Sequence, residues 1–449
     1  MTRNPAFQGL CLAVWLVGCT GTALLGGGVQ RQPSLQPPQQ QPPHVDNPAP
    51  DGGSSNLGGG NTDAGSGSSG SSCLTSAFSL SVGKTRVLMG ARMDNSESAV
   101  FAAAPAVDVR YQYVTGYVPE APTACTSCSN SGCSGNWWGC YGSSPGSQLR
   151  NFVNVSAARG TLPMLTYYQM INAANGDSSA TDLAAVQDSA VLRSYLNDLR
   201  FLLQQLGTQP ALLHLEPDFW GNLEYPNTDA TQTAAAVTAA NPTDCASQPN
   251  TLAGLGHCMI SMVRKYAPKT LVGLHASPWS TGVDCYRNLD STLDVVAEAH
   301  KTAAFLRACG ADLGDFVVVE TQDRDAGALG SASFWDVNNQ TLPNFHRSFA
   351  WAKTIADDVG KPLIWWQTPV GNMTMDSVHQ DNRIDYFFSH MNELVAAHTA
   401  AVVFGAGQRT AAWIDTNPTT CAANRYSDHG YCLGKIAAYL QTGGINTCP

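Results

Sequence analysis

Short, nearly continuous apolar runs alternate with longer amphipathic stretches from residue 73 onward. Runs of this kind, rich in Val, Leu, Ile and Ala, are typical of parallel strands that are buried on both faces. The runs predicted to be strands are residues 86–94, 109–117, 162–170, 211–217, 271–279, 315–323, 362–370 and 401–408.

The stretches between these runs carry apolar residues at helical spacing. One face of 182–207 holds Leu192, Tyr195, Leu196, Leu199, Leu202, Leu203 and Leu206. Residues 345–361 and 383–398 show the same periodicity. Eight strand-like runs alternating with helices predict an α/β fold, a closed (β/α)₈ TIM-type barrel over 73–449. An open doubly wound sheet is the alternative, but no glycine-rich phosphate turn follows the first run.

Residues 1–18 have the pattern of an export signal. Arg3 supplies a positive charge, and the apolar core 9–17 is too short to span a membrane. The ending Leu-Val-Gly-Cys at 16–19 resembles the lipobox of bacterial lipoproteins, in which the cysteine is lipidated and becomes the new N-terminus. This resemblance implies that acyl chains on Cys19 anchor the protein to a membrane of the bacterial cell envelope. An ordinary cleaved signal is the alternative.

A low-complexity linker is predicted for residues 19–72, Pro/Gln-rich in its first part and Gly/Ser-rich in its second. We expect the first part to be stiff and extended and the second to be a loose coil. Neither part can bury enough apolar surface to fold. Such a linker would hold a catalytic domain, residues 73–449, away from the membrane.

The 449 residues carry a net charge of −10, and only 13% of them are charged. This balance argues against nucleic acid as a partner, because nucleic-acid binding needs basic surface stripes. It suits an exported monomer whose ligand is neutral and polar. No cofactor and no metal are expected.

The chain has 14 cysteines. Setting aside Cys11 in the signal and Cys19 leaves twelve, and an even number in an exported chain predicts disulfides. Four of them crowd the segment 125–140 and predict two local disulfides, with a zinc knuckle as the alternative. Cys73 and Cys448 are expected to join the ends of the domain.

The carboxyl ends of the strands form the active face of a (β/α)₈ barrel. Most of the predicted strands end in a carboxylate, an amide or an aromatic ring. The fourth strand ends in Glu216 and Asp218, and the sixth ends in Glu320. The side chains expected to contact substrate are Asp94, Tyr168, His275, Trp279, Trp366, Gln367 and Gln408.

Paired carboxyl groups that face one cleft are what glycosidic cleavage requires. One must be protonated to donate to the leaving oxygen, and the other must be ionised to attack or to activate water. We therefore expect a glycoside hydrolase that cleaves O-glycosidic bonds in a polysaccharide or oligosaccharide. Glu216 is the predicted proton donor, Glu320 the predicted nucleophile or base, and Asp218 a partner of Glu216. A non-catalytic barrel that binds glycan is the alternative function.

Two family resemblances support this class. The His-Leu-Glu-Pro step at 214–217 resembles the Asn-Glu-Pro of the clan of retaining barrel glycosidases, whose acid/base is that glutamate. This chain departs from that clan at Leu215 and in placing Glu320 on the sixth strand, because the clan's second glutamate follows the seventh. The Glu-Pro-Asp at 216–218 also resembles the family 6 cellulases, inverting enzymes with a distorted barrel. In them a disulfide-linked helical stretch follows, here 245–258, and aspartates do the chemistry, which implies roles for Asp218 and Asp94.

Structural roles are the alternatives for these residues. Glu216 could pair with Arg92, Glu320 could pair with Arg324, and Asp218 could cap a helix. His275 could be a core residue. Trp365 and Trp366 are adjacent, so only one can face the barrel interior.

Three further patterns remain open or count against other chemistries. The Trp137–Trp138 pair could be a sugar platform or loop packing. His214 and His275 with Glu216 leave a metal site as a minor alternative. The GxSxG match at 142–146 lies in the cysteine-rich loop and argues against a serine hydrolase.

Overall fold

The computed structural model describes residues 73–130, 132–133, 137–321, 324–330, 333–406, 411–416 and 426–448. Eight parallel strands close in sequence order into a barrel, so the predicted (β/α)₈ fold is confirmed. The strands are β1 (Leu88–Arg92), β2 (Val109–Val114), β3 (Leu162–Tyr167), β4 (Ala211–Leu215), β5 (Thr270–Ala276), β6 (Phe316–Glu320), β7 (Leu363–Thr368) and β8 (Thr399–Phe404). Each coincides with a predicted run. The signal, the linker, Cys19 and Gln408 lie outside the described residues.

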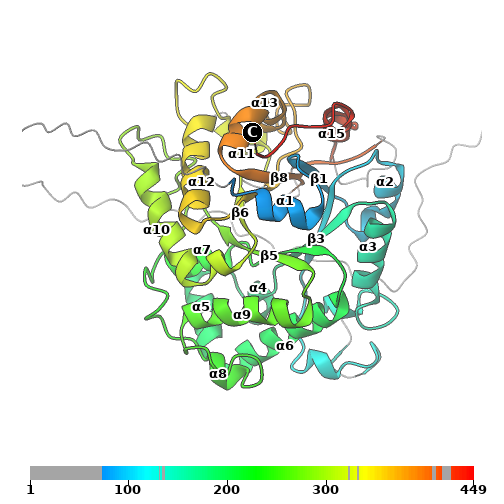
Figure 1. Ribbon diagram of the computed structural model, residues 1–449, viewed down its shortest axis with the longest axis vertical. Helices are drawn as coiled ribbons and strands as arrows, with labels where there is room; N and C mark the ends of the chain where they lie inside the picture. Colours follow the sequence, from blue (N-terminus) through cyan, green and yellow to red (C-terminus); the bar gives the residue numbers. More distant parts are fainter. Residues whose placement is uncertain are drawn as a thin grey trace, which may run out of the picture.

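Helices surround the barrel, with α9, α10, α12 and α3 visible around it in Figure 1. Their bounds are α1 (Ser76–Val82), α2 (Ser98–Ala103), α3 (Ser147–Ala158), α4 (Met170–Ala173), α5 (Ser179–Gln187), α6 (Ser189–Leu206), α7 (Phe219–Glu224), α8 (Val237–Ala240), α9 (Leu252–Tyr266), α10 (Val295–Ala308), α11 (Ala326–Leu329), α12 (Phe345–Val359), α13 (Arg383–Ser389), α14 (Met391–Ala396) and α15 (Tyr431–Gln441). A two-stranded sheet, β9 (Ala412–Trp413) with β10 (Tyr426–Ser427), follows β8.

Two of the predicted helices are divided. The stretch 182–207 breaks at Asp188, whose carboxylate accepts hydrogen bonds from the backbone N–H groups of Ala190 and Val191 and so begins α6 anew. The stretch 383–398 breaks at His390, between α13 and α14. Apolar periodicity continues across both breaks, which is why the pattern alone predicts single helices.

The barrel interior is a packed core and is closed at its amino-terminal end by α1. Phe78 of α1 lies 6.1 Å from the ring of Phe316 in β6 and belongs to the interior cluster with Leu88, Met164 and Val318. Figure 1 looks onto this end, with α1 lying across the strands. The functional face is therefore the opposite, carboxyl-terminal end.

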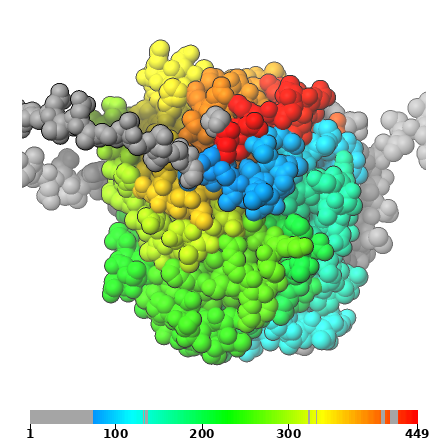
Figure 2. Space-filling view, viewed as in Figure 1, coloured from blue at the N-terminus to red at the C-terminus, as the bar shows by residue number. Residues whose placement is uncertain are grey.

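Four disulfides join the described cysteines. Cys125–Cys133 and Cys128–Cys140 confirm the two local bridges and exclude the zinc knuckle. Cys73–Cys448 confirms the bridge between the domain ends, and Figure 2 shows the C-terminal segment packed beside α1. Cys245–Cys258 pins α9 to the loop before it. Cys285, Cys309 and Cys432 are buried free thiols, so not all of the predicted cysteines pair within the described residues.

Within the part of the chain that the structure describes, we find no helix with the length and apolar character that a bilayer crossing demands.

Candidate active site

Glu216 follows β4, but its carboxylate turns away from the barrel axis. Leu212 and His214 point inward, and strand alternation would place Glu216 inward as well. Its φ of +55° breaks that alternation. Its Oε1 accepts hydrogen bonds from the N–H groups of Gln169 (3.0 Å) and Met170 (3.1 Å) and from the Tyr195 hydroxyl of α6 (2.9 Å).

This position has consequences for the Glu216 carboxyl group. The side chain is 0% exposed, and its Oε2 has no hydrogen-bond partner. Burial raises the pKa of Glu216 to about 8, against the three hydrogen bonds that lower it. The described contacts lie on the helix side of β4, and Arg92 is not among them. The role of proton donor for Glu216 stays a prediction, and this geometry does not favour it.

Asp198 of α6 is a second buried carboxylate on the same side of the strands. It accepts hydrogen bonds from the indole N–H groups of Trp137 (2.6 Å) and Trp138 (2.8 Å), from the Tyr167 hydroxyl (2.9 Å) and from the Gln169 amide (3.0 Å). Both tryptophans are buried, so they pack in the loop and are not a sugar platform. The region behind β3 and β4 is therefore a structural network.

Asp218 lies on the other side, in a cluster of carboxyl groups after β3 and β4. The Tyr168 hydroxyl is 2.7 Å from Asp218 Oδ2 and 3.2 Å from Asp177 Oδ2. The Asn222 amide donates to Asp177 (2.8 Å) and to Asp182 (2.9 Å). Asp218 is the N-cap residue of α7 but makes no capping hydrogen bond, so the capping alternative is wrong.

The electrostatics of this cluster favour a bound proton. Burial and the neighbouring charges of Asp177 and Asp218 raise the pKa of Asp182 to about 7. The single hydroxyl hydrogen of Tyr168 cannot satisfy both carboxylates that it faces. At neutral pH the cluster can therefore hold a proton beside Asp218.

A line of buried polar side chains crosses β3, β4, β5 and β6 inside the barrel. Thr166 Oγ1 is 3.3 Å from His214 Nδ1, and His214 Nε2 is 3.1 Å from His275 Nδ1. His275 Nε2 lies 4.0 Å from Glu320 Oε1 and has no hydrogen-bond partner. Glu320 is the outermost group of this line, with its side chain 15% exposed. His214 and His275 face each other, and Glu216 points elsewhere, so the proposed metal triad is not formed.

Burial also fixes the charge of the two histidines. It lowers the pKa of His275 to about 3 and that of His214 well below its ordinary value, with the neighbouring ring adding to the effect at His214. Both imidazoles are therefore neutral over the physiological range.

Aromatic side chains connect the two carboxyl regions. The rings of Tyr113 and Tyr168 are 6.3 Å apart, those of Tyr113 and Trp366 are 5.6 Å apart, and those of Trp366 and His275 are 5.8 Å apart. The chain of contacts thus runs from Asp218 through these rings to Glu320. The indole N–H of Trp366 is buried and has no partner. Trp365 packs against the outer helices, which confirms that only one of the pair faces inward.

Gln367 also has a positive φ, but here the break in alternation turns the side chain toward the site and not away from it. It follows the inward Trp366, so alternation would point it outward, but its φ is +53°. Its Oε1 accepts a 2.6 Å hydrogen bond from the Tyr113 hydroxyl. The pairing register between β7 and β8 shifts between Trp365 and Thr368, the segment that contains Gln367.

The remaining predicted contacts lie at the edge of the site. Arg92 lies over the rings of Tyr113 (5.6 Å) and Trp413 (4.8 Å) and forms an ion pair with Asp94. Asp94 itself accepts from the Ser96 N–H in a capping box, so part of its carboxylate is committed to structure.

Trp279 is half-buried and lies against the backbone of α7. A Cβ at Gly221 would lie 2.9 Å from its ring, so only glycine permits this approach.

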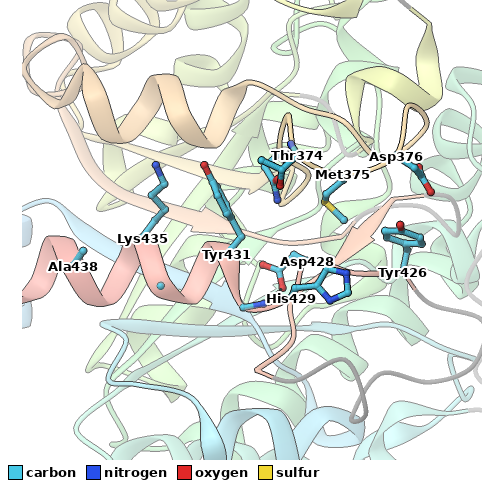
Figure 3. Close-up of a pocket in the computed structure, with 12 residues that line it drawn as sticks. Thr374, Met375, Asp376, Tyr426, Asp428, His429, Tyr431, Lys435 and Ala438 are labelled. Atoms are coloured by element: carbon cyan, nitrogen blue, oxygen red, sulfur yellow. Dashed lines mark hydrogen bonds between the residues drawn. The ribbon is translucent and has the colours of Figure 1, made fainter.

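A separate pocket of about 450 Å³ lies between the loop after β7 and α15 (Figure 3). It is lined by Asp376, Tyr426, Asp428, His429 and Lys435 among others, and none of the predicted site residues lines it. The Asp428 carboxylate accepts from the backbone N–H groups of Asp415, Gly430 and Cys432. The side chain therefore holds the loop and the start of α15 together.

Sequence reasoning missed Asp177, Asp182 and Tyr113. Tyr113 could have been found by counting inward positions along 109–117. Asp177 lies in the Asn-Gly-Asp turn after β3, in a loop on the active face, which is a usable signal. Asp182 begins an apolar helical stretch, so nothing local distinguishes it from an exposed helical aspartate.

The chain was compared with known proteins. No family model matches it, and no curated protein matches it. The solved structures that resemble it include a GH113 β-1,4-mannanase (11% identity, TM-score 0.46, covering 80% of this chain and 99% of that one). A Cellulomonas fimi endo-β-1,4-mannanase double mutant has 14% identity and a TM-score of 0.44, covering 83% and 75%.

The endoglucanase Cel6 from Mycobacterium tuberculosis has 13% identity and a TM-score of 0.31. The match covers 60% of this chain and 64% of that one, so the chain spans less than two thirds of its length. These are likenesses of fold, and no residue of this chain takes its role from them.

Proposed function

We propose that this protein is an exported, lipid-anchored glycoside hydrolase that cleaves O-glycosidic bonds in a polysaccharide. One observation carries the proposal. Asp218 follows β4 and Glu320 ends β6 at the carboxyl end of a closed barrel, and the two are linked by a continuous set of contacts that runs through Tyr168, Tyr113, Trp366 and His275. Two carboxyl groups in different environments on one face are the minimum that this chemistry needs.

Asp218 is the proton donor in this proposal. It shares the Tyr168 hydroxyl with Asp177. Burial and the charges of Asp177 and Asp218 raise the pKa of the neighbouring Asp182 to about 7, so Asp182 can hold the proton that Asp218 delivers. A protonated Asp218 can donate to the glycosidic oxygen as the bond to the sugar carbon breaks. The cluster then replaces the proton from solvent.

Glu320 is the ionised partner, acting as nucleophile or as base toward water. Its side chain is partly exposed, and His275, whose Nε2 lies 4.0 Å from Glu320 Oε1, is neutral. The anomeric form of the product, followed by NMR, separates the two roles: retention requires attack by Glu320, and inversion requires activation of water.

The surroundings favour a neutral, polar substrate. The rings of Tyr113, Trp366 and Trp413, the Gln367 amide and the Arg92 guanidinium group lie together at the carboxyl end of the barrel, a set of aromatic and polar groups of the kind that sugars contact. Trp279 remains a proposed substrate contact, and so does Gln408, which lies outside the described residues.

Export and anchoring at Cys19 are part of the proposal. The four disulfides support an oxidising compartment, and the Leu-Val-Gly-Cys at 16–19 supports lipidation. Mass spectrometry of the mature N-terminus tests this directly. A diacylated Cys19 is expected, and a free N-terminus at any other residue would contradict it.

The activity is tested on a panel of soluble and insoluble polysaccharides, with release of reducing ends as the readout. The parent protein should cleave at least one member, and the double variant Asp218→Asn/Glu320→Gln should cleave none. Binding of that variant to the same panel is the control. If the parent binds a glycan with no cleavage, the alternative of a glycan-binding barrel replaces this proposal.

A further inference from the structure

We propose that the imidazole pair, His214 and His275, is a positioning device that presents a fixed N–H donor to the Glu320 carboxylate. The inference rests on the proposed function, because it concerns the working of Glu320 at that site. It assigns His275 to the carboxylate and not to the substrate. The geometry that points to it is the line Thr166–His214–His275–Glu320, in which only the last gap, 4.0 Å, is longer than a hydrogen bond.

The tautomers of the two imidazoles follow from the number of hydrogens that they carry. A neutral imidazole carries one N–H, so a single hydrogen lies between His214 Nε2 and His275 Nδ1. If it belongs to His214, then His275 Nδ1 accepts and His275 Nε2 carries the proton that faces Glu320. His214 Nδ1 is then an acceptor, which the Thr166 hydroxyl satisfies at 3.3 Å.

The opposite arrangement is unfavourable when Glu320 is ionised. If His275 Nδ1 carries the hydrogen, its Nε2 lone pair faces the Glu320 carboxylate, and two electron-rich atoms oppose each other at 4.0 Å. The first arrangement satisfies the ring nitrogens between Thr166 and His275 and turns the remaining N–H, at His275 Nε2, toward the Glu320 carboxylate. Hydrogen bonds of this kind are often long in the free enzyme and shorten when substrate binds.

The surroundings hold the imidazole pair in place. Trp366 contacts both rings edge-on, at 4.9 Å from His214 and 5.8 Å from His275. Gly273, which pairs with His214 in the ladder, has no room for a Cβ because Phe316 lies 2.4 Å from where it would be. The charge of Glu320 also reaches the buried Tyr286 in the loop after β5, where it is one of the causes that raise the pKa of that phenol. Tyr286 is neutral, because burial raises its pKa well above its ordinary value.

Two matched variants of the full chain separate the two ends of His275. His275→Asn keeps an amide at the Nδ1 position, bonded to His214, but removes the donor to Glu320. His275→Gln places an amide N–H near the Nε2 position and loses the bond to His214. We expect His275→Asn to lower kcat/KM by about 10- to 100-fold, as loss of an outer-shell orienting partner does, and His275→Gln to restore most of it.

The pH profile is the readout that a packing role would not move. In His275→Asn the acidic limb of kcat/KM should move up by roughly one pH unit, because the ionised carboxylate has lost a donor. Equal losses in both variants with an unchanged profile would overturn the proposal in favour of core packing. A rise in KM alone would overturn it in favour of a contact between His275 and substrate.

A measurement that needs no turnover keeps this inference separate from the proposed function. Two-bond ¹H–¹⁵N NMR spectra of the imidazoles distinguish Nδ1–H from Nε2–H rings. Both rings should be Nε2–H tautomers in the parent protein at pH 7. Nδ1–H tautomers would contradict the proposal even if the enzyme cleaves polysaccharide, and the expected result would stand even if no substrate is found.

Discussion

Glu216 and Glu320 end similar apolar strands two positions apart in the barrel, yet they face different surroundings. Glu216 is fully buried, with its carboxylate held by two backbone N–H groups and Tyr195. Glu320 is partly exposed and continues a line of polar groups inside the barrel. The difference arises from one backbone angle, the positive φ of Glu216. A carboxylate at a strand end is therefore a candidate, and the backbone conformation of that residue decides whether its side chain faces the barrel interior or the helices.

Gln367 shows that a positive φ can also turn a side chain toward the site. Left-handed conformations of non-glycine residues cost roughly 1–3 kcal/mol and persist where surrounding contacts hold them. At Glu216 the positive φ turns the carboxylate toward the helix side of β4. At Gln367 it turns the side-chain amide toward the Tyr113 hydroxyl at the carboxyl end of the barrel. The two turns together decide which of these polar groups lies among the side chains proposed to contact substrate.

Among the variants that test this difference between the two regions, the largest loss of activity is expected on replacing Asp218. Replacing a general acid costs about 10²- to 10⁴-fold in rate, so Asp218→Asn should lose that much kcat/KM on polysaccharide. On an aryl glycoside whose leaving group needs no proton, the loss should be far smaller. Steady-state kinetics on both substrates measure it. Equal losses on the two would remove Asp218 from the role of donor.

The pH dependence of stability tests the burial of Glu216. Its folded pKa of about 8 lies above its ordinary value of 4.5, so the folded protein binds more protons than the unfolded chain between those pH values. Stability should therefore fall as pH rises through that window, by about 5 kcal/mol. Denaturant unfolding at a series of pH values measures it. In Glu216→Gln this part of the slope should vanish, and an unchanged slope would contradict the account.

A smaller effect distinguishes two tyrosines that each bond a carboxyl group. Tyr195→Phe removes a donor to Glu216 and should cost about 1 kcal/mol of stability with little change in rate. Tyr168→Phe removes the hydroxyl between Asp177 and Asp218 and should lower kcat/KM about tenfold. Thermal unfolding and kinetics on both variants measure the split. A rate loss confined to Tyr195→Phe would reverse the assignment of the two regions.

The sequence predicted the barrel well because its signal is repeated. Each strand is a nearly continuous apolar run, and errors at single boundaries do not change the count or the order. The disulfides in 125–140 and between Cys73 and Cys448 were predicted from spacing and position. The breaks at Asp188 and His390 were missed, because helical periodicity continues across them.

The site was harder to predict, because it depends on the direction in which each side chain points and on contacts between segments that are distant in the sequence. Asp218 and Glu320 were predicted from their place at strand ends, and the structure places both at the carboxyl end of the barrel. The orientation of Glu216 was missed, because period-two alternation assumes extended backbone, and nothing in Glu-Pro indicates a positive φ. Asp177 and Tyr168 meet Asp218 only through the fold.

Glu320 is proposed to act in catalysis at the carboxyl end of the barrel, whereas Glu216 is proposed to have a structural role on the helix side of β4. The direct test compares kcat/KM for Glu320→Gln and Glu216→Gln on the polysaccharide that the parent cleaves, with circular dichroism to confirm that both variants fold. The account predicts a loss of about 10²- to 10⁴-fold for Glu320→Gln, and less than about tenfold for Glu216→Gln, whose amide oxygen keeps the three hydrogen bonds. A folded Glu216→Gln variant without turnover, beside an active Glu320→Gln variant, would contradict it.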